Sequence, residues 1–187
     1  MQHNAMPAYE RLVTAEEFAR IPNDDYHYEL VEGRVVRVSP PGSRHAVLIA
    51  RMTALLSQYT DANDLGAVMA VGGFKIAANP DTVREPDIAF VRRDRIPETG
   101  VPDGYWPGPP DLAVEVRSPG DRPSEIRAKV ADYLARGVRL VWVVDPKAQT
   151  VTAHSQESMV RRYGAADDLI GGDVLPGFRC RVRRIFD

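Results

Sequence analysis

The segment DLAVEVRSPGDRPSEIRAKVADYLARGVRLVWVV, residues 111–144, decides the fold of this protein. Its two ends, residues 111–116 and 140–144, are short apolar runs of the kind found in buried strands. Between them, apolar side chains recur at helical spacing: Ile126, Val130, Tyr133 and Leu134. Gly137 then provides a typical helix stop. A strand, a helix and a second strand in this order predict two parallel strands joined by a right-handed crossover.

The sequence on either side of this segment predicts further helices and strands. YHYELVEGRVVRVS, residues 26–39, alternates about a Glu32-Gly33 turn, which predicts a β-hairpin. Thr14 and Glu17 fit a capping box at the start of a short helix before that hairpin. The other expected elements are a core-facing helix over 44–59, a strand with a Gly-Gly bend over 67–77, a strand over 85–93, a Pro-rich loop over 96–110, a strand over 150–155 and a final extended segment over 173–186. Together they predict an α/β fold in which helices flank a mixed β-sheet.

Length and composition predict one ordinary globular domain. Of the 187 residues, 44% are hydrophobic and 27% are charged, which is enough apolar surface for a core. We expect residues 1–13 to form a loose leader and residues 14–187 to form the domain. No apolar run approaches the ~18 residues of a membrane span, and there is no signal-peptide pattern, so we expect a cytoplasmic protein without membrane contact. The single cysteine, Cys180, excludes an internal disulfide framework and a cysteine-based zinc cluster.

Two carboxylates occupy positions where an unpaired charge is costly. Glu115 interrupts the apolar run LAVEV, and Asp87 opens IAFV directly after Pro86. If the two strands are neighbours, alternation allows both carboxylates to meet on one sheet face. A divalent cation would relieve their repulsion, and hard oxygen ligands favour Mg²⁺ or Mn²⁺ over zinc. The alternative is a buried ion pair between Glu115 and Arg117 or another arginine.

Four further residues are candidates for a supporting role. Arg117 follows Glu115 by two positions and can supply positive charge, but a guanidinium cannot act as a general base. Lys129 lies on the flank of the helical stripe and could reach the carboxylates, although residue type alone favours a border lysine whose ammonium extends to solvent. His45 at a helix start and Glu29 on the hairpin carry no functional signal by themselves.

Six short stretches, specific in their order and spacing taken together, resemble a known family. They are YELVEGRVVRVSPPGSRH (28–45), EPDIAFV (85–91), PPDLAVEVRSPG (109–120), the K…Y…GV spacing (129–138), VWVVDP (141–146) and VLPGF (174–178). This succession is similar to the Uma-type restriction endonuclease family of the PD-(D/E)XK nuclease-like superfamily, from about Thr14 to Phe186. The resemblance implies a restriction-endonuclease-like fold with an N-terminal β-hairpin extension.

The resemblance also implies roles for individual residues. The PD element falls on Pro86-Asp87 and the second acid on Glu115, so that Asp87, Glu115 and the backbone carbonyl of Val116 would bind the metal. The superfamily's lysine is expected where this chain has Arg117, and Lys129 on the following helix resembles its displaced substitute. The family likeness adds two further catalytic candidates, His45 and Glu29. The arginine at position 117 leaves catalytic competence open.

These observations support one functional hypothesis and two alternatives. The first is a Mg²⁺- or Mn²⁺-dependent endonuclease that hydrolyses DNA, as a homodimer by fold analogy. The second is a catalytically degenerate module that binds DNA or a protein partner, which the net charge of −2 and Arg117 favour. The third keeps the chemistry but takes RNA or a small phosphodiester.

Two features could contact nucleic acid. The candidate phosphate-binding arginines are Arg92, Arg93, Arg95, Arg179, Arg181, Arg183 and Arg184, although the tail arginines also suit a solvated edge strand. Tyr105 and Trp106 in the Pro-rich loop could stack on bases or fasten the loop to the domain.

Overall fold

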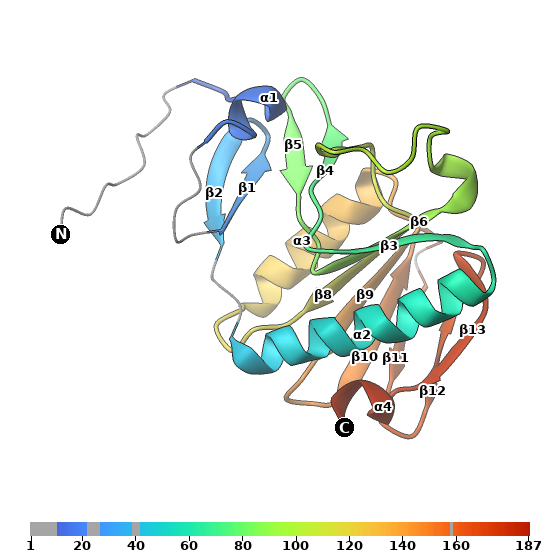
Figure 1. Cartoon of the computed structure of the whole chain (residues 1–187). Helices are drawn as coiled ribbons and strands as arrows, with labels where there is room; N and C mark the ends of the chain where they lie inside the picture. The colour runs from blue at the N-terminus through green and yellow to red at the C-terminus, as the bar shows by residue number, and fades with distance from the viewer. Residues whose placement is uncertain (1–10, 22–26, 39–41, 158) are drawn as a thin grey trace.

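A six-stranded mixed sheet forms the centre of the protein, with strand order β11-β10-β9-β8-β6-β3 (Figure 1). The computed structural model describes residues 11–21, 27–38, 42–157 and 159–187. The six strands are β3 (Gly66–Ala70), β6 (Ile88–Arg92), β8 (Leu112–Val116), β9 (Leu140–Asp145), β10 (Thr150–Ser155) and β11 (Val160–Tyr163). Strands β8 and β9 are parallel, and α3 (Pro123–Ala135) connects them, which confirms the predicted strand–helix–strand unit.

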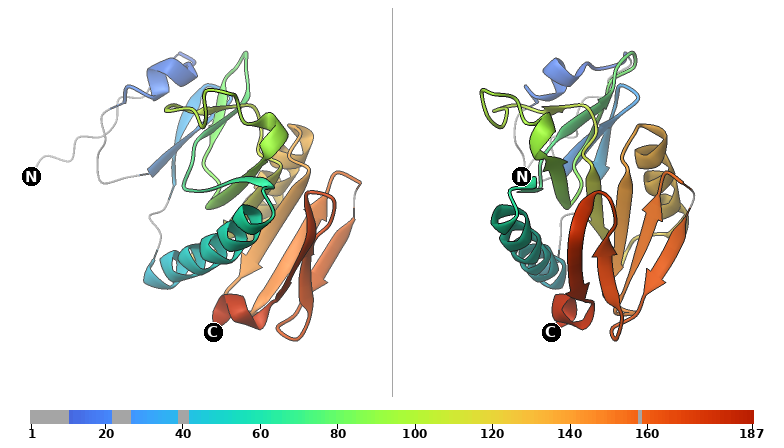
Figure 2. Two further views of the ribbon diagram at one scale, coloured as in Figure 1. Left: turned by 45° about the vertical axis from the view of Figure 1, so that its right-hand side comes forward. Right: turned by 90° about the vertical axis from the view of Figure 1, so that its right-hand side faces the viewer.

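Helices cover both faces of this sheet, as Figure 2 shows for α2 and α3. On one face, α3 packs Val130 and Tyr133 against alternate strand residues such as Ala113. On the other, α2 (Ser43–Ala62) packs through Leu48 and Met52, joined by the β12–β13 hairpin and α4. The bounds of these last elements are Asp168–Gly171 for β12, Leu175–Arg181 for β13 and Arg183–Phe186 for α4. The α/β class with a mixed sheet flanked by helices is therefore confirmed.

A second, five-stranded sheet has the order β2-β1-β5-β4-β7 and contains the predicted hairpin. Its strands are β1 (His27–Val31), β2 (Arg34–Val38), β4 (Phe74–Ala77), β5 (Thr82–Arg84) and β7 (Trp106–Pro107). The capping box of Thr14 with Glu17 begins α1 (Ala15–Phe18) beside this sheet, as predicted. Val13 is also buried there, whereas residues 1–10 of the predicted leader lie outside the described residues.

The single strand predicted over 67–77 is wrong, because the chain leaves one sheet and enters the other at this point. Strand β3 ends at Ala70 and β4 begins at Phe74. Between them, Val71 has a φ of 56°, and a Cβ on Gly73 would lie 2.4 Å from the Tyr105 ring. The Gly-Gly pair therefore permits a break and a close approach that alternation alone does not reveal.

The Pro-rich loop is fastened to the domain by the two aromatic residues singled out above. The ring of Tyr105 stacks on Phe18 at 6.0 Å, and Trp106 is buried as part of β7. Arg93–Arg95 form a single 3-10 turn, η1, at the start of this connection. Of the two roles expected for Tyr105 and Trp106, these contacts support the packing role.

Gly73→Ala tests the close approach at the sheet-to-sheet crossing. Because the new methyl group meets the Tyr105 ring, we expect the free energy of unfolding to fall by about 1–3 kcal/mol, the usual cost of overpacking. Urea unfolding measures this change. Gly104→Ala is the matched control, since nothing lies within 4 Å of its Cβ position. An equal effect of both substitutions would contradict the packing at Gly73.

Candidate active site

A cleft of about 620 Å³ lies between the five-stranded sheet that contains the hairpin and one end of the six-stranded sheet. The predicted site residues that line it are Glu29, His45, Asp87, Glu115, Val116 and Lys129. Glu29 comes from β1, His45 from α2, Glu115 and Val116 from β8, and Lys129 from α3, while Asp87 directly precedes β6. Five of the six side chains predicted to form a site are therefore brought together, and Val116 lies with them.

The pairing of β6 with β8 accounts for the proximity of the two carboxylates. The strands are antiparallel neighbours, with Ile88 opposite Val114, so Asp87 and Glu115 occupy the adjoining position. The expectation that both carboxylates use one sheet face is wrong, because their contacts are with the helices that cover opposite faces. Asp87 contacts His45 of α2, and Glu115 contacts α3. Asp87 precedes β6, so the alternation of the strand does not dictate its direction.

Two donors hold the Asp87 carboxylate. The backbone N–H of Val116 donates to Oδ2 at 2.7 Å, and His45 Nε2 lies 3.1 Å from the same oxygen. The hydrogen bond to Asp87 raises the pKa of His45 against the opposing effect of burial. His45 Nδ1 is buried and has no hydrogen-bond partner among the described residues. The imidazole is thus oriented through Nε2, toward the carboxylate.

Glu115 is a buried acid of the cleft whose side chain contacts α3. Its side chain accepts hydrogen bonds from the Tyr133 hydroxyl at 2.7 Å and from Lys129 Nζ at 2.9 Å. Burial raises the pKa of Glu115 to about 7, even though Lys129 acts in the opposite direction. The cation beside Glu115 is therefore Lys129, not the arginine that the sequence left as an alternative.

Lys129 bridges two carboxylates from different sheets. Its ammonium lies 2.9 Å from Glu115 on β8 and 3.0 Å from Glu29 on β1. Burial alone would lower the pKa of Lys129, but the two carboxylates outweigh it and raise the pKa above the ordinary value. The solvent-directed border lysine favoured by residue type is wrong, because Glu29 and Glu115 draw the ammonium inward.

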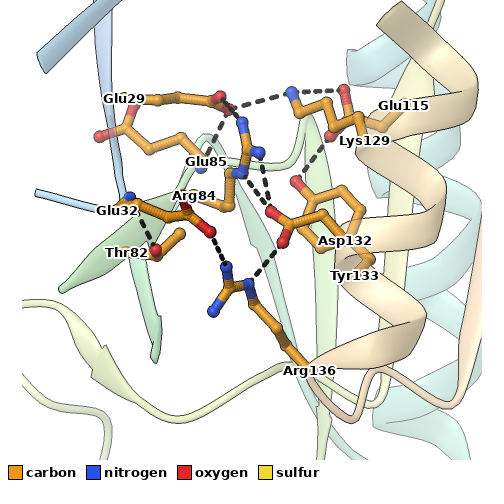
Figure 3. Close-up of polar contacts among 10 residues, drawn as sticks. All are labelled: Glu29, Glu32, Thr82, Arg84, Glu85, Glu115, Lys129, Asp132, Tyr133 and Arg136. Atoms are coloured by element: carbon orange, nitrogen blue, oxygen red, sulfur yellow. Dashed lines mark hydrogen bonds and ion pairs between the residues drawn. The ribbon is translucent and has the colours of Figure 1, made fainter. Parts of the chain in front are cut away.

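Glu29 begins a chain of ion pairs that ties the hairpin to α3 (Figure 3). Arg84 donates to Glu29 at 2.7 Å and to Asp132 at 2.7 Å. Asp132 also accepts from Arg136, which lies 3.6 Å from Glu32 in the hairpin turn. Burial works to raise the pKa of Glu29, but Lys129 and Arg84 together hold it below the usual range.

Sequence reasoning missed Arg84 and Asp132 and assigned Tyr133 to the core alone. The available signal for Tyr133 was its position four residues after Lys129, which places both on one helix face. Arg84 directly precedes the Glu85-Pro86-Asp87 stretch, but no spacing rule connects it to Glu29, 55 residues away in sequence.

Arg117 does not join the cleft. Its backbone N–H continues the ladder by donating to the Val144 carbonyl, and its guanidinium donates to Asp145 at 2.7 Å. It lines a neighbouring cavity instead. The two-residue spacing from Glu115 predicted that Arg117 adds positive charge to the site, but Asp145 at the end of β9 draws its side chain away.

The donor set of the cleft fits a hard divalent cation. Asp87 and Glu115 supply carboxylate oxygens at adjoining strand positions, and Val116 also lines the cleft. No three His, Cys, Asp or Glu side chains converge for a metal within the described part of the chain. Mg²⁺ commonly binds through one or two carboxylates and keeps several waters, so two carboxylates suffice for it.

The comparisons with known proteins agree with this fold. Residues 15–183 match the model of the Uma2 family, described as "Putative restriction endonuclease", and the chain belongs to that family. A crystal structure titled as a putative nuclease belonging to DUF820 from Anabaena variabilis ATCC 29413 superposes with a TM-score of 0.81. It shares 18% identity and covers 93% of this chain and 97% of its own. The search of curated proteins found no match.

These findings confirm the resemblance stated from the six sequence stretches and the restriction-endonuclease-like fold. None of the described helices is long and apolar enough to cross a membrane.

Lys129→Met tests the central ion pairs. It leaves Glu29 and Glu115 buried without their shared cation, which should cost about 3–5 kcal/mol of unfolding free energy. The folded-state pKa of Glu115, which is already raised, should then rise further, and that of Glu29 should rise from its lowered value. The variant therefore loses stability as the pH increases through these pKa values. Its deficit in unfolding free energy, relative to the wild type, grows from acidic to alkaline pH. Urea unfolding across this range measures it.

The matched control is Lys147→Met, because Lys147 is exposed and its ammonium makes no ion pair with the described residues. We expect this variant to change stability little at any pH. A Lys129→Met deficit that does not depend on pH would contradict the bridging role of the ammonium.

Proposed function

We propose that this protein is a divalent-metal-dependent endonuclease that hydrolyses phosphodiester bonds of DNA in the cleft. The observation that carries the proposal is the convergence of Asp87, Glu115 and Lys129, from three separate elements, at the ends of two neighbouring strands. Membership of the Uma2 family supports the same activity. We also propose the homodimer, because symmetric cutting of a duplex requires two sites related by a two-fold axis.

Asp87, Glu115 and the Val116 carbonyl would hold Mg²⁺ or Mn²⁺. Such an ion, when bound, supplies positive charge for the scissile phosphate and lowers the pKa of water. His45 keeps the Asp87 carboxylate in place through Nε2, and Tyr133 does the same for Glu115 through its hydroxyl. Both act as positioning residues, since they touch the proposed ligands and not the reacting atoms.

Lys129 is the proposed catalytic cation of the chain. Its ammonium has three N–H donors, and Glu29 and Glu115 account for two directions of contact. The remaining donor can orient the attacking water or stabilise negative charge that develops on the phosphate. Glu29 would position Lys129, and Arg117 takes no part in this assignment because its guanidinium pairs with Asp145.

Plasmid cleavage with added Mg²⁺ or Mn²⁺ tests the function. We expect the wild type to cut and the double variant Asp87→Ala, Glu115→Ala to lose all detectable cleavage, since both carboxylate ligands are gone. The control is Glu98→Ala, Asp103→Ala, which removes the same charge from exposed loop positions. Equal cleavage by all three preparations would overturn the site assignment. A wild type that neither cuts nor binds Mn²⁺ would favour the degenerate binding module.

The pH dependence of Mn²⁺ affinity tests the role of Glu115 without any substrate. A carboxyl group must release its proton to bind the ion, and the pKa of Glu115 is raised to about 7. Its ionised fraction increases about tenfold between about pH 6 and about pH 8, so affinity should rise by the same factor. Calorimetry measures this profile.

Tyr133→Phe provides the comparison for that experiment. It removes a hydrogen bond to the ionised carboxylate, so the midpoint of the affinity profile should move to higher pH. An affinity that is flat across this range, in the wild type and the variant alike, would remove Glu115 from the metal site.

A further inference from the structure

A second cavity, of about 530 Å³, lies beside the cleft on the α3 side of the central sheet. Ile126 of α3 lines both cavities, so the two are neighbours on either side of this residue. We call this cavity the basic pocket, and its polar and charged lining residues are Arg117, Arg127, Asp145, Thr150, Thr152, His154 and Arg162. Its remaining walls are mostly apolar and come from α3 and β9.

The basic pocket carries uncompensated positive charge. Its one acid, Asp145, is paired with Arg117. Arg127 and Arg162 are exposed, and neither forms an ion pair with any residue in the described ranges. The Nε atom of Arg117 is buried and finds no acceptor among the residues that the structure describes. The pocket thus offers donors and positive charge that no described residue engages.

The cleft has the opposite balance. Among the described residues, six carboxylate side chains line it, against three Arg or Lys side chains: Glu29, Glu85, Asp87, Glu115, Asp121 and Glu125 against Arg37, Arg84 and Lys129. A polyanionic strand therefore gains little electrostatic attraction from the cleft walls themselves. The phosphates on either side of the cleaved bond must therefore be bound by cationic side chains outside the cleft.

The arginines proposed from the sequence as phosphate patches do not supply those cations. Five of the seven are engaged by acids: Arg92 by Asp94, Arg93 by Asp64, Arg95 by Asp111, and Arg179 and Arg181 by Asp168. Arg183 and Arg184 belong to α4, which packs with α2 on the other face of the sheet. The pairing partners are distant in sequence in several cases, so composition could not reveal them.

We propose that the basic pocket binds backbone phosphates of the DNA next to the bond held in the cleft, with Arg127 and Arg162 as the phosphate-contacting side chains. This inference rests on the proposed nuclease function, because it takes the same DNA as its ligand. Guanidinium groups suit the task because they present planar, permanently charged donors to phosphate oxygens. The apolar surface of Val130, Leu134 and Val143 suits the adjoining sugar.

The experiment measures binding of a fluorescein-labelled DNA duplex by anisotropy, in EDTA so that no cleavage occurs, over a range of salt concentrations. We expect Arg127→Ala, Arg162→Ala to weaken binding and to reduce the slope of log K against log salt by about two units, one for each lost phosphate contact. The matched control Arg183→Ala, Arg184→Ala removes equal charge from the opposite face and should bind as the wild type does. Circular dichroism confirms that both variants fold.

The outcomes separate this inference from the proposed function. The inference is overturned if the Arg127, Arg162 variant binds DNA as tightly as the wild type, or if both variants lose DNA affinity equally. This holds even where the wild type cleaves plasmid. If only that variant weakens while the wild type never cleaves, the pocket stands and the nuclease proposal fails. A wild type that binds no DNA, or binds only a protein partner, overturns the inference.

Discussion

The ammonium of Lys129, held between Glu29 and Glu115, is the interaction on which the rest of the site depends. It joins β1 of one sheet to β8 of the other through α3, with contacts of 3.0 and 2.9 Å. Two buried carboxylates facing one cleft repel each other, and removal of their shared cation leaves Glu29 with Arg84 alone and Glu115 without a cationic partner among the described residues. The charge of Glu115 and one of the links between the hairpin and α3 therefore depend on this side chain.

The ion pairs beyond Lys129 make this arrangement a network and not an isolated contact. Arg84 continues it from Glu29 to Asp132, and Arg136 returns it to the hairpin turn at Glu32. Each buried charge has a partner of opposite sign, which is the condition under which such groups are tolerated inside a protein. The hairpin, a small element by itself, gains its orientation from these contacts with α3.

Charge is distributed unevenly over the surface near the site. Acids predominate in the cleft, where oxygen ligands for a cation are required, and arginines predominate in the adjoining basic pocket. A net charge of −2 for the whole chain conceals this separation, because composition sums over both regions. Arginine-rich stretches of sequence were poor indicators of a phosphate-binding surface, because acids that lie beside most of these arginines in the folded structure neutralise their charge.

The sequence by itself determined most of the local elements and the parallel strand pair of the crossover unit. Apolar runs, helical spacing and the Glu32-Gly33 turn were sufficient for the crossover unit and the hairpin, because these depend on near neighbours in the chain. The unusual placement of Asp87 and Glu115 next to or within apolar runs also singled out two acids that the structure places in the cleft.

Only the tertiary structure decided which charges meet. It turned Arg117 toward Asp145, drew Lys129 inward and divided residues 67–77 between two sheets. The physical reason is that a charged side chain turns toward the opposite charge within its reach. Here those opposite charges are contributed by elements far apart in the chain.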